Sequence, residues 1–141
     1  MNKRLDALVR ICGQFGVTLL YSFGSRAGEI RDWLAERRGE LPLGPSDADI
    51  GAKGLPGIKW PVKEKVELAG ALEDLFGGLR VDLVCLSEAG PFLAAEIIRG
   101  ERLFAGDGNE ADEYELYVLR RAGDLAPLER ERMALVLGEP T

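Results

Sequence analysis

Two kinds of apolar periodicity alternate along this chain, and that alternation limits the folds it can adopt. Lys3–Phe15 carries apolar residues three and four positions apart, the spacing of an amphipathic helix. Val17–Phe23 is short, rich in β-branched and aromatic residues, and followed by a glycine, so it predicts a buried strand. The same change of period recurs downstream. We therefore expect an α/β (α+β) fold with a small mixed sheet of about four strands flanked by helices.

The remaining elements follow from the same patterns. Further strands are expected at residues 47–52 and 80–86, with a short edge strand at 102–105. Further helices are expected at residues 29–38, 62–76, 91–99, 110–121 and 127–137. Val62 and Val66 are assigned to the apolar side of the helix at 62–76. A chain of 141 residues is the size of one domain, so we expect a single domain over 1–141, with about 107–141 as a C-terminal helical extension.

Composition excludes several classes of function. The chain has 18 basic and 24 acidic residues, and a net charge of −6 argues against binding to duplex nucleic acid. It has no histidine, which excludes Ser-His-Asp catalysis and histidine-ligated zinc. Cys12 and Cys85 are too far apart in sequence for a CxxC motif. No apolar run is long enough for a membrane helix and the first residues are charged, so we expect a cytoplasmic protein without a membrane partner.

Three aspartates occur where strands would otherwise be apolar. Asp47 and Asp49 are two positions apart, which on a strand sends both side chains to one face. Asp82 interrupts the apolar run of the strand at 80–86. If the two strands are neighbours, three carboxylates converge, and like charges repel unless a cation lies between them. A site made only of oxygen ligands suits Mg²⁺.

A second motif follows the first strand. Gly24 allows a close backbone approach, Ser25 offers a hydroxyl, and Arg26 offers a guanidinium. Together they are suited to holding the phosphates of a nucleotide. A metal site beside such a cradle indicates nucleotidyl transfer, in which a hydroxyl attacks the α-phosphate and pyrophosphate leaves.

Each motif also has a structural alternative. Asp47 and Asp49 can belong to a turn, because Pro45 and Ser46 precede them, or to the N-cap of a helix. Asp82 can form an ion pair with Arg80 or with a cation of a helix. The glycine and serine at 24–25 can form an ordinary turn after a strand. For Arg26, a phosphate contact and a solvated surface charge are both open.

These segments resemble a known family. Residues 21–27 (YSFGSRA), 46–50 (SDADI), 81–84 (VDLV) and 97–104 (IIRGERLF) are similar to the minimal nucleotidyltransferase (MNT) domain of the DNA polymerase β superfamily. The resemblance covers about residues 1–125 and implies the polymerase β-like nucleotidyltransferase fold.

The resemblance also implies an activity. Many such domains are antitoxins that transfer AMP from ATP to a tyrosine of a HEPN-domain toxin. By this resemblance Asp47 and Asp49 would bind two Mg²⁺ ions. Asp82 would bind the catalytic ion and help deprotonate the acceptor hydroxyl, and Gly24 and Ser25 would hold the triphosphate.

The chain departs from the family in one segment. The family has about ten residues between the serine and the first aspartate, whereas 21 residues separate Ser25 from Asp47 here. This insert leaves open whether Arg31, Arg37 or Arg38 reaches the nucleotide, and it can also be a lid or a partner-recognition element. Two other functions remain: a non-catalytic antitoxin or binding module of the same fold, and nucleotidyl transfer to a small molecule such as an aminoglycoside.

Overall fold

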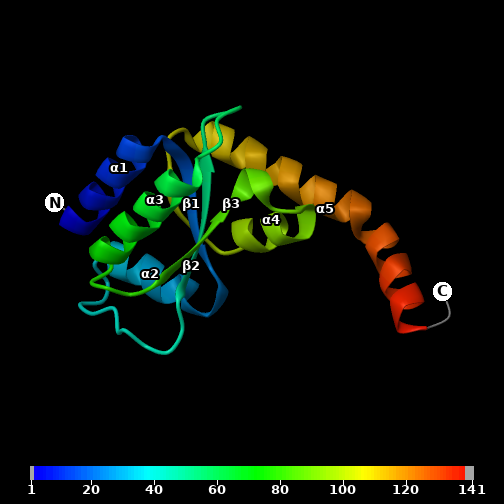
Figure 1. Cartoon of the computed structure of the whole chain (residues 1–141), viewed down its shortest axis with the longest axis horizontal. Coiled ribbons are helices and arrows are strands. Elements are labelled where there is room, and N and C mark those ends of the chain that lie inside the picture. Colours follow the sequence, from blue (N-terminus) through cyan, green and yellow to red (C-terminus); the bar gives the residue numbers. More distant parts are fainter. Residues whose placement is uncertain (1, 139–141) are drawn as a thin grey trace.

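A computed structural model describes residues 2–138 and shows a four-stranded sheet between two groups of helices (Figure 1). The strands are β1 (Val17–Phe23), β2 (Ala48–Gly54), β3 (Val81–Cys85) and β4 (Glu101–Ala105). The α-helices are α1 (Lys3–Phe15), α2 (Ala27–Leu34), α3 (Val62–Leu75), α4 (Pro91–Ile98) and α5 (Gly108–Leu137). Two short 3₁₀ turns, η1 (Gly24–Arg26) and η2 (Leu86–Glu88), follow β1 and β3. The expected mixed sheet flanked by helices is confirmed.

The sheet has the order β3-β2-β1-β4. β1 pairs antiparallel with both of its neighbours, and β2 pairs parallel with β3. The parallel pair requires a crossover, which α3 supplies. β4 lies at an edge, as predicted.

Each face of the sheet has its own apolar core. On one face, Leu20 and Ile50 pack under α1, α2 and α3, with Leu8, Leu68 and Leu72 among the fully buried side chains. On the other face, Tyr21 packs with Ile97 of α4 and with Val118 of α5. Figure 1 shows the same division, with α1, α2 and α3 on one side of the strands and α4 and α5 on the other. Successive side chains of β1 and β2 therefore point alternately into the core under α1–α3 and toward α4 and α5.

The C-terminal segment differs from the prediction. We expected two helices, at 110–121 and 127–137, but α5 is one helix with Pro127 inside it. A proline within a helix removes one backbone hydrogen bond and bends the helix, and it does not have to end it. Figure 1 shows α5 changing direction over its last third. Beyond Pro127, the apolar side chains of Leu128, Leu135 and Val136 are exposed.

The apolar side of α3 was also predicted wrongly in part. Leu68 and Leu72 are buried as expected, whereas Val62 and Val66 are exposed. β3, beside which α3 packs, is an edge strand, so less of the helix surface is covered than the pattern of apolar residues indicates. No helix within residues 2–138 is long and apolar enough to cross a membrane.

Candidate active site

Asp49 and Asp82 lie side by side on adjacent strands. They are register partners in the parallel pairing of β2 with β3. Neighbouring strands are about 4.8 Å apart, and partners in register point to the same face. The sequence neighbours of Asp49, Ala48 and Ile50, point to the opposite face and are completely buried. The sequence predicts that these two carboxylates converge if their strands are neighbours, and the register of β2 and β3 agrees with that prediction.

Asp47 lies just outside the strand. β2 begins at Ala48, whose N–H donates to the carbonyl of Arg80 at 2.8 Å. Asp47 is exposed and follows a bend at Pro45 and Ser46, so the expectation that the strand includes Asp47 is wrong by one residue. In the part of the chain that the structure describes, no three His, Cys, Asp or Glu side chains are gathered closely enough to hold a metal ion. Joint metal binding by the three aspartates would require their side chains to turn toward one another.

Gly24 lies directly against Asp49. Phe23, the last residue of β1, is the register partner of Asp49, and Gly24 follows it with φ +74°. A Cβ at this position would lie 2.4 Å from Oδ2 of Asp49. Glycine is therefore required for two reasons: the left-handed backbone and the close carboxylate. Ser25 follows in η1 and is exposed.

The surroundings of Asp49 change the pKa of its carboxyl group. Burial, followed by the nearby carboxylates of Asp82, Asp47 and Glu96, raises the pKa of Asp49 above its ordinary value. A divalent cation would relieve this repulsion, and carboxylate oxygens are the ligands that Mg²⁺ prefers. The donor set thus fits Mg²⁺ in chemistry and charge.

Sequence reasoning missed Glu96. It is an exposed residue of α4, between Ala95 and Ile97, which are buried. A single carboxylate within an apolar helix is the same signal that singled out Asp82, and it could have drawn attention to this position. Only the packing of α4 on the sheet brings Glu96 toward Asp49.

Arg26 is not a surface charge. Its side chain is only 5% exposed, and its guanidinium pairs with Glu29, with Nε 3.0 Å from Oε2. It also donates from Nη1 to the carbonyl of Ser46 at 3.2 Å and from Nη2 to the carbonyl of Pro42. The predicted phosphate contact is not tested by these bonds, which all run to the protein itself.

The arginines of the insert are paired with carboxylates. Arg31 lies 2.7 Å from Glu101 of β4 and 3.0 Å from Asp32. Arg37 pairs with Asp32 at 3.5 Å, and Arg38 pairs with Glu29 at 3.6 Å. No ion pair within residues 2–138 joins Asp82 to Arg80 or to a cation of a helix, so the structural alternative for Asp82 finds no support.

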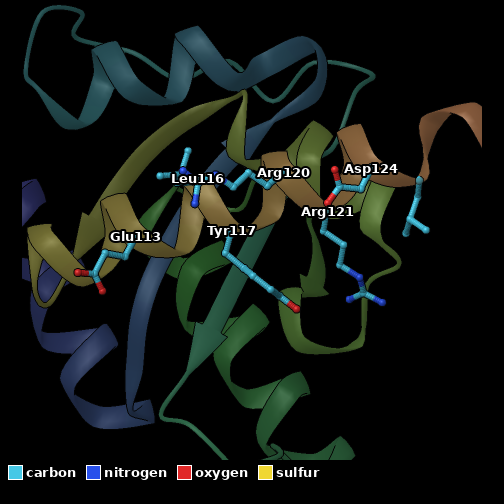
Figure 2. A pocket seen from close by; sticks show the side chains of 7 residues that line it. Glu113, Leu116, Tyr117, Arg120, Arg121 and Asp124 are labelled. Carbon is cyan, nitrogen blue, oxygen red and sulfur yellow. The ribbon is translucent and has the colours of Figure 1, made fainter.

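Of two hollows in the surface, one lies beside the predicted site residues and the other lies away from them. One of about 270 Å³ lies beside the candidate site and is lined by Ser25, Arg26, Glu29, Pro42, Gly44, Pro45 and Ser46. A larger one of about 620 Å³ lies along α5, between Glu113 and Leu125, and contains none of the predicted site residues (Figure 2). The smaller hollow is the one that adjoins the predicted phosphate cradle.

Comparison with known proteins tests the fold. No family model matches the sequence, and no curated protein matches it. Solved structures do match. A toxin–antitoxin structure with AMP-PNP has a TM-score of 0.70 at 17% identity, over 94% of this chain and 98% of that one. An MNT antitoxin in complex with a tri-AMPylated HEPN toxin of Shewanella oneidensis has a TM-score of 0.68 at 16% identity, over 97% of this chain and 99% of that one.

The chain has the minimal nucleotidyltransferase fold. A further structure, described as a minimal nucleotidyltransferase, is 28% identical, with a TM-score of 0.50 over 70% of this chain and 86% of that one. The resemblance read from the motifs at 21–27, 46–50 and 81–84 is thus confirmed at the level of the fold. Within this fold, Gly24, Asp49 and Asp82 gather at one end of the sheet, where β1 ends and β2 and β3 begin.

Proposed function

We propose that this protein is a Mg²⁺-dependent nucleotidyltransferase that transfers AMP from ATP to a tyrosine hydroxyl of a HEPN toxin, and so acts as its antitoxin. One observation carries the proposal: Asp49 and Asp82 are register partners, and Gly24 lies against Asp49 at the end of β1. Two carboxylates thus adjoin the segment that we propose to hold the phosphates, an arrangement that nucleotidyl transfer requires.

Each residue has a role in this proposal. Asp47 and Asp49 would hold two Mg²⁺ ions, and Asp82 would hold the catalytic one. Bound Mg²⁺ supplies positive charge that offsets these carboxylates and the triphosphate. The backbone at Gly24 and the hydroxyl of Ser25 bind the β- and γ-phosphates. Gly24 has no side chain, so a phosphate can approach the backbone beside Asp49 closely.

The reaction is an in-line displacement. The tyrosine oxygen forms a bond to the α-phosphorus, and the bond from that phosphorus to the oxygen bridging the α- and β-phosphates breaks. Pyrophosphate leaves with the electron pair of the broken bond. The carboxylate of Asp82 accepts the hydroxyl proton, directly or through water.

The choice of partner rests on the proteins of the same fold. One of them is an antitoxin bound to a tri-AMPylated HEPN toxin, and a toxin–antitoxin structure contains AMP-PNP. A HEPN partner, ATP as substrate and a cytoplasmic location are carried to this chain as parts of the proposal.

Transfer of α-labelled AMP tests it. ATP labelled on the α-phosphate is incubated with Mg²⁺, an extract of the native host, and either wild type or the Asp47→Asn, Asp49→Asn double variant. A labelled protein that appears only with wild type is the expected result, and its identity names the partner. Equal labelling with the double variant would contradict the roles of Asp47 and Asp49.

A non-catalytic antitoxin is the second candidate. One observation favours it, since no three carboxylates within residues 2–138 are already gathered for a metal ion. The two candidates differ in co-expression with the toxin. The double variant rescues growth if the protein acts by binding alone, and it fails to rescue growth if transfer is required.

A further inference from the structure

Arg26 joins two segments that both belong to the candidate site. It follows Gly24 and Ser25 directly, and its guanidinium donates to the carbonyl of Ser46, the residue before Asp47. A second bond, to the carbonyl of Pro42, holds the middle of the same loop. One buried side chain therefore connects the predicted phosphate cradle to the segment that carries Asp47.

Asp47 needs such support, because the regular hydrogen bonding of the sheet starts after it. The ladder between β2 and β3 begins at Ala48, which pairs with Val81. Residues 36–47 form neither helix nor strand. The position of Asp47 relative to Asp49 thus depends on how the loop before it is held.

The bonds of Arg26 leave little capacity for a phosphate. A guanidinium has five N–H groups. Four bonds are formed: Nε and Nη2 to Glu29 at 3.0 and 3.2 Å, Nη1 to Ser46 at 3.2 Å, and Nη2 to Pro42. The side chain is also almost completely buried. A direct phosphate contact would require these bonds to break.

We propose that Arg26 is a positioning residue, which sets Asp47 beside Asp49 by holding the loop at Pro42 and Ser46, and does not itself contact the nucleotide. Glu29 is part of the same device, because it fixes the orientation of the guanidinium from α2. This inference rests on the proposed function, in which Asp47 binds metal.

Mn²⁺ binding, measured by electron paramagnetic resonance without nucleotide, tests the proposal. The variants are Arg26→Leu, Asp47→Asn and their combination. Loss of a side chain that orients a metal ligand weakens metal binding by about tenfold or more. We therefore expect Arg26→Leu and Asp47→Asn each to weaken Mn²⁺ binding, and the combined variant to bind no more weakly than Asp47→Asn.

Arg31→Leu is the matched control. Arg31 lies on the adjacent helix and has two carboxylate partners, but no bond to residues 39–47. Its loss is expected to leave Mn²⁺ affinity within twofold of wild type. A loss as large as that of Arg26→Leu would show a general effect of removing charge from this helix, and would overturn the proposal.

Arg26→Lys separates positioning from phosphate binding. Lysine keeps the charge and serves well as a phosphate ligand, but it lacks the planar fork that reaches several acceptors. We expect it to weaken Mn²⁺ binding like Arg26→Leu, while AMP-PNP binding in EDTA stays at the wild-type level for both. Loss of AMP-PNP affinity in Arg26→Leu with recovery in Arg26→Lys would establish a phosphate contact and overturn the proposal.

Limited proteolysis and hydrogen exchange together keep the test independent of folding defects. In Arg26→Leu and Arg26→Lys, a protease of broad specificity is expected to cleave the loop at residues 39–47 faster, while the amides of β1 and β2 exchange as in wild type. Unchanged cleavage of that loop would overturn the proposal. If Asp47→Asn alone leaves Mn²⁺ affinity unchanged, the metal role of Asp47 fails and the inference falls with it. If the losses of Mn²⁺ affinity in Arg26→Leu and Asp47→Asn add up in the combined variant, the positioning role of Arg26 is overturned, while the proposed function stands.

Discussion

The two faces of β2 carry different kinds of side chain. On one face Ala48, Ile50 and Ala52 are completely buried under the helices α1–α3. On the other face, Asp49 stands beside Asp82, and Gly51 lies so near α4 that a Cβ would be 2.4 Å from a methyl group of Ile97. One strand thus supplies a packed core through alternate residues and, through Asp49 between them, a carboxylate of the candidate site.

The two faces of β2 contribute differently to the stability of the fold and to the proposed chemistry. The covered face is stabilised by burial of apolar side chains, whereas the Asp49 face contains a carboxylate whose ionised form is disfavoured by burial and by other carboxylates. Residues that a fold keeps at some cost to its stability are commonly functional. Truncating a side chain on the covered face is therefore expected to lower the free energy of unfolding, whereas neutralising Asp49 is expected to raise it.

The largest effect is expected on the covered face. Ile50→Ala removes a completely buried side chain from the core between β2 and the helices. Such truncations cost about 2–5 kcal/mol, because packing is lost and a cavity remains. Urea denaturation measures this loss in the free energy of unfolding. A loss below about 0.5 kcal/mol would show that this face is not the packed one.

Gly24→Ala tests the contact between β1 and Asp49. The new methyl group meets Oδ2 of Asp49, and the backbone must keep a φ of +74°. We expect a loss of about 1–2 kcal/mol from the left-handed backbone alone, together with loss of AMP transfer.

Gly16→Ala is the control for Gly24→Ala. Gly16 also has a positive φ, of +68°, but a Cβ there meets nothing within 4 Å. It should lose a similar free energy of unfolding in the same urea experiment and retain transfer. Full transfer by Gly24→Ala would contradict the close placement of the cradle and Asp49.

Asp49→Asn should stabilise the protein at neutral pH. The pKa of Asp49 is raised in the folded state, so ionised Asp49 destabilises the fold above that pKa, and the cost disappears as pH falls and the carboxyl is protonated. We expect the free energy of unfolding at pH 7 to be higher than that of wild type. The gain should shrink as the pH is lowered, when thermal unfolding is followed from pH 7 to pH 4. A destabilised variant at pH 7 would contradict this electrostatic account.

The smallest effect is expected at Val66. Although it lies in a helix with an apolar stripe, its side chain is 66% exposed. Val66→Ser should change the free energy of unfolding by less than about 0.5 kcal/mol in urea. A loss comparable with that of Ile50→Ala would indicate that α3 is buried there in solution.

Periodicity and motif order predict most of the fold, and their failures have physical reasons. Alternation in β2 places Ala48 and Ile50 opposite Asp49, which can be read from the sequence. The pairing of Asp49 with Asp82 can be expected only if β2 and β3 are neighbours, and register is a property of the whole sheet. The single helix through Pro127 was missed because proline marks a bend as well as an end.

The candidate site was less predictable than the fold. Arg26 was left between phosphate contact and surface charge, since its partners Pro42 and Ser46 are distant in sequence and offer backbone carbonyls, which any residue has. Glu96 reaches the site through the packing of α4, so sequence spacing alone does not reveal it. The roles of Asp47, Asp49 and Asp82 in metal binding stay predictions.

One paired measurement tests the central claim, that β2 carries stability on one face and chemistry on the other. Transfer of label from α-labelled ATP and the free energy of unfolding are measured together for Asp49→Asn and its sequence neighbour Ile50→Val. We predict that Asp49→Asn is at least as stable as wild type and transfers no label. Ile50→Val should lose about 0.5–1.5 kcal/mol and retain transfer. Retained transfer in folded Asp49→Asn would contradict the claim.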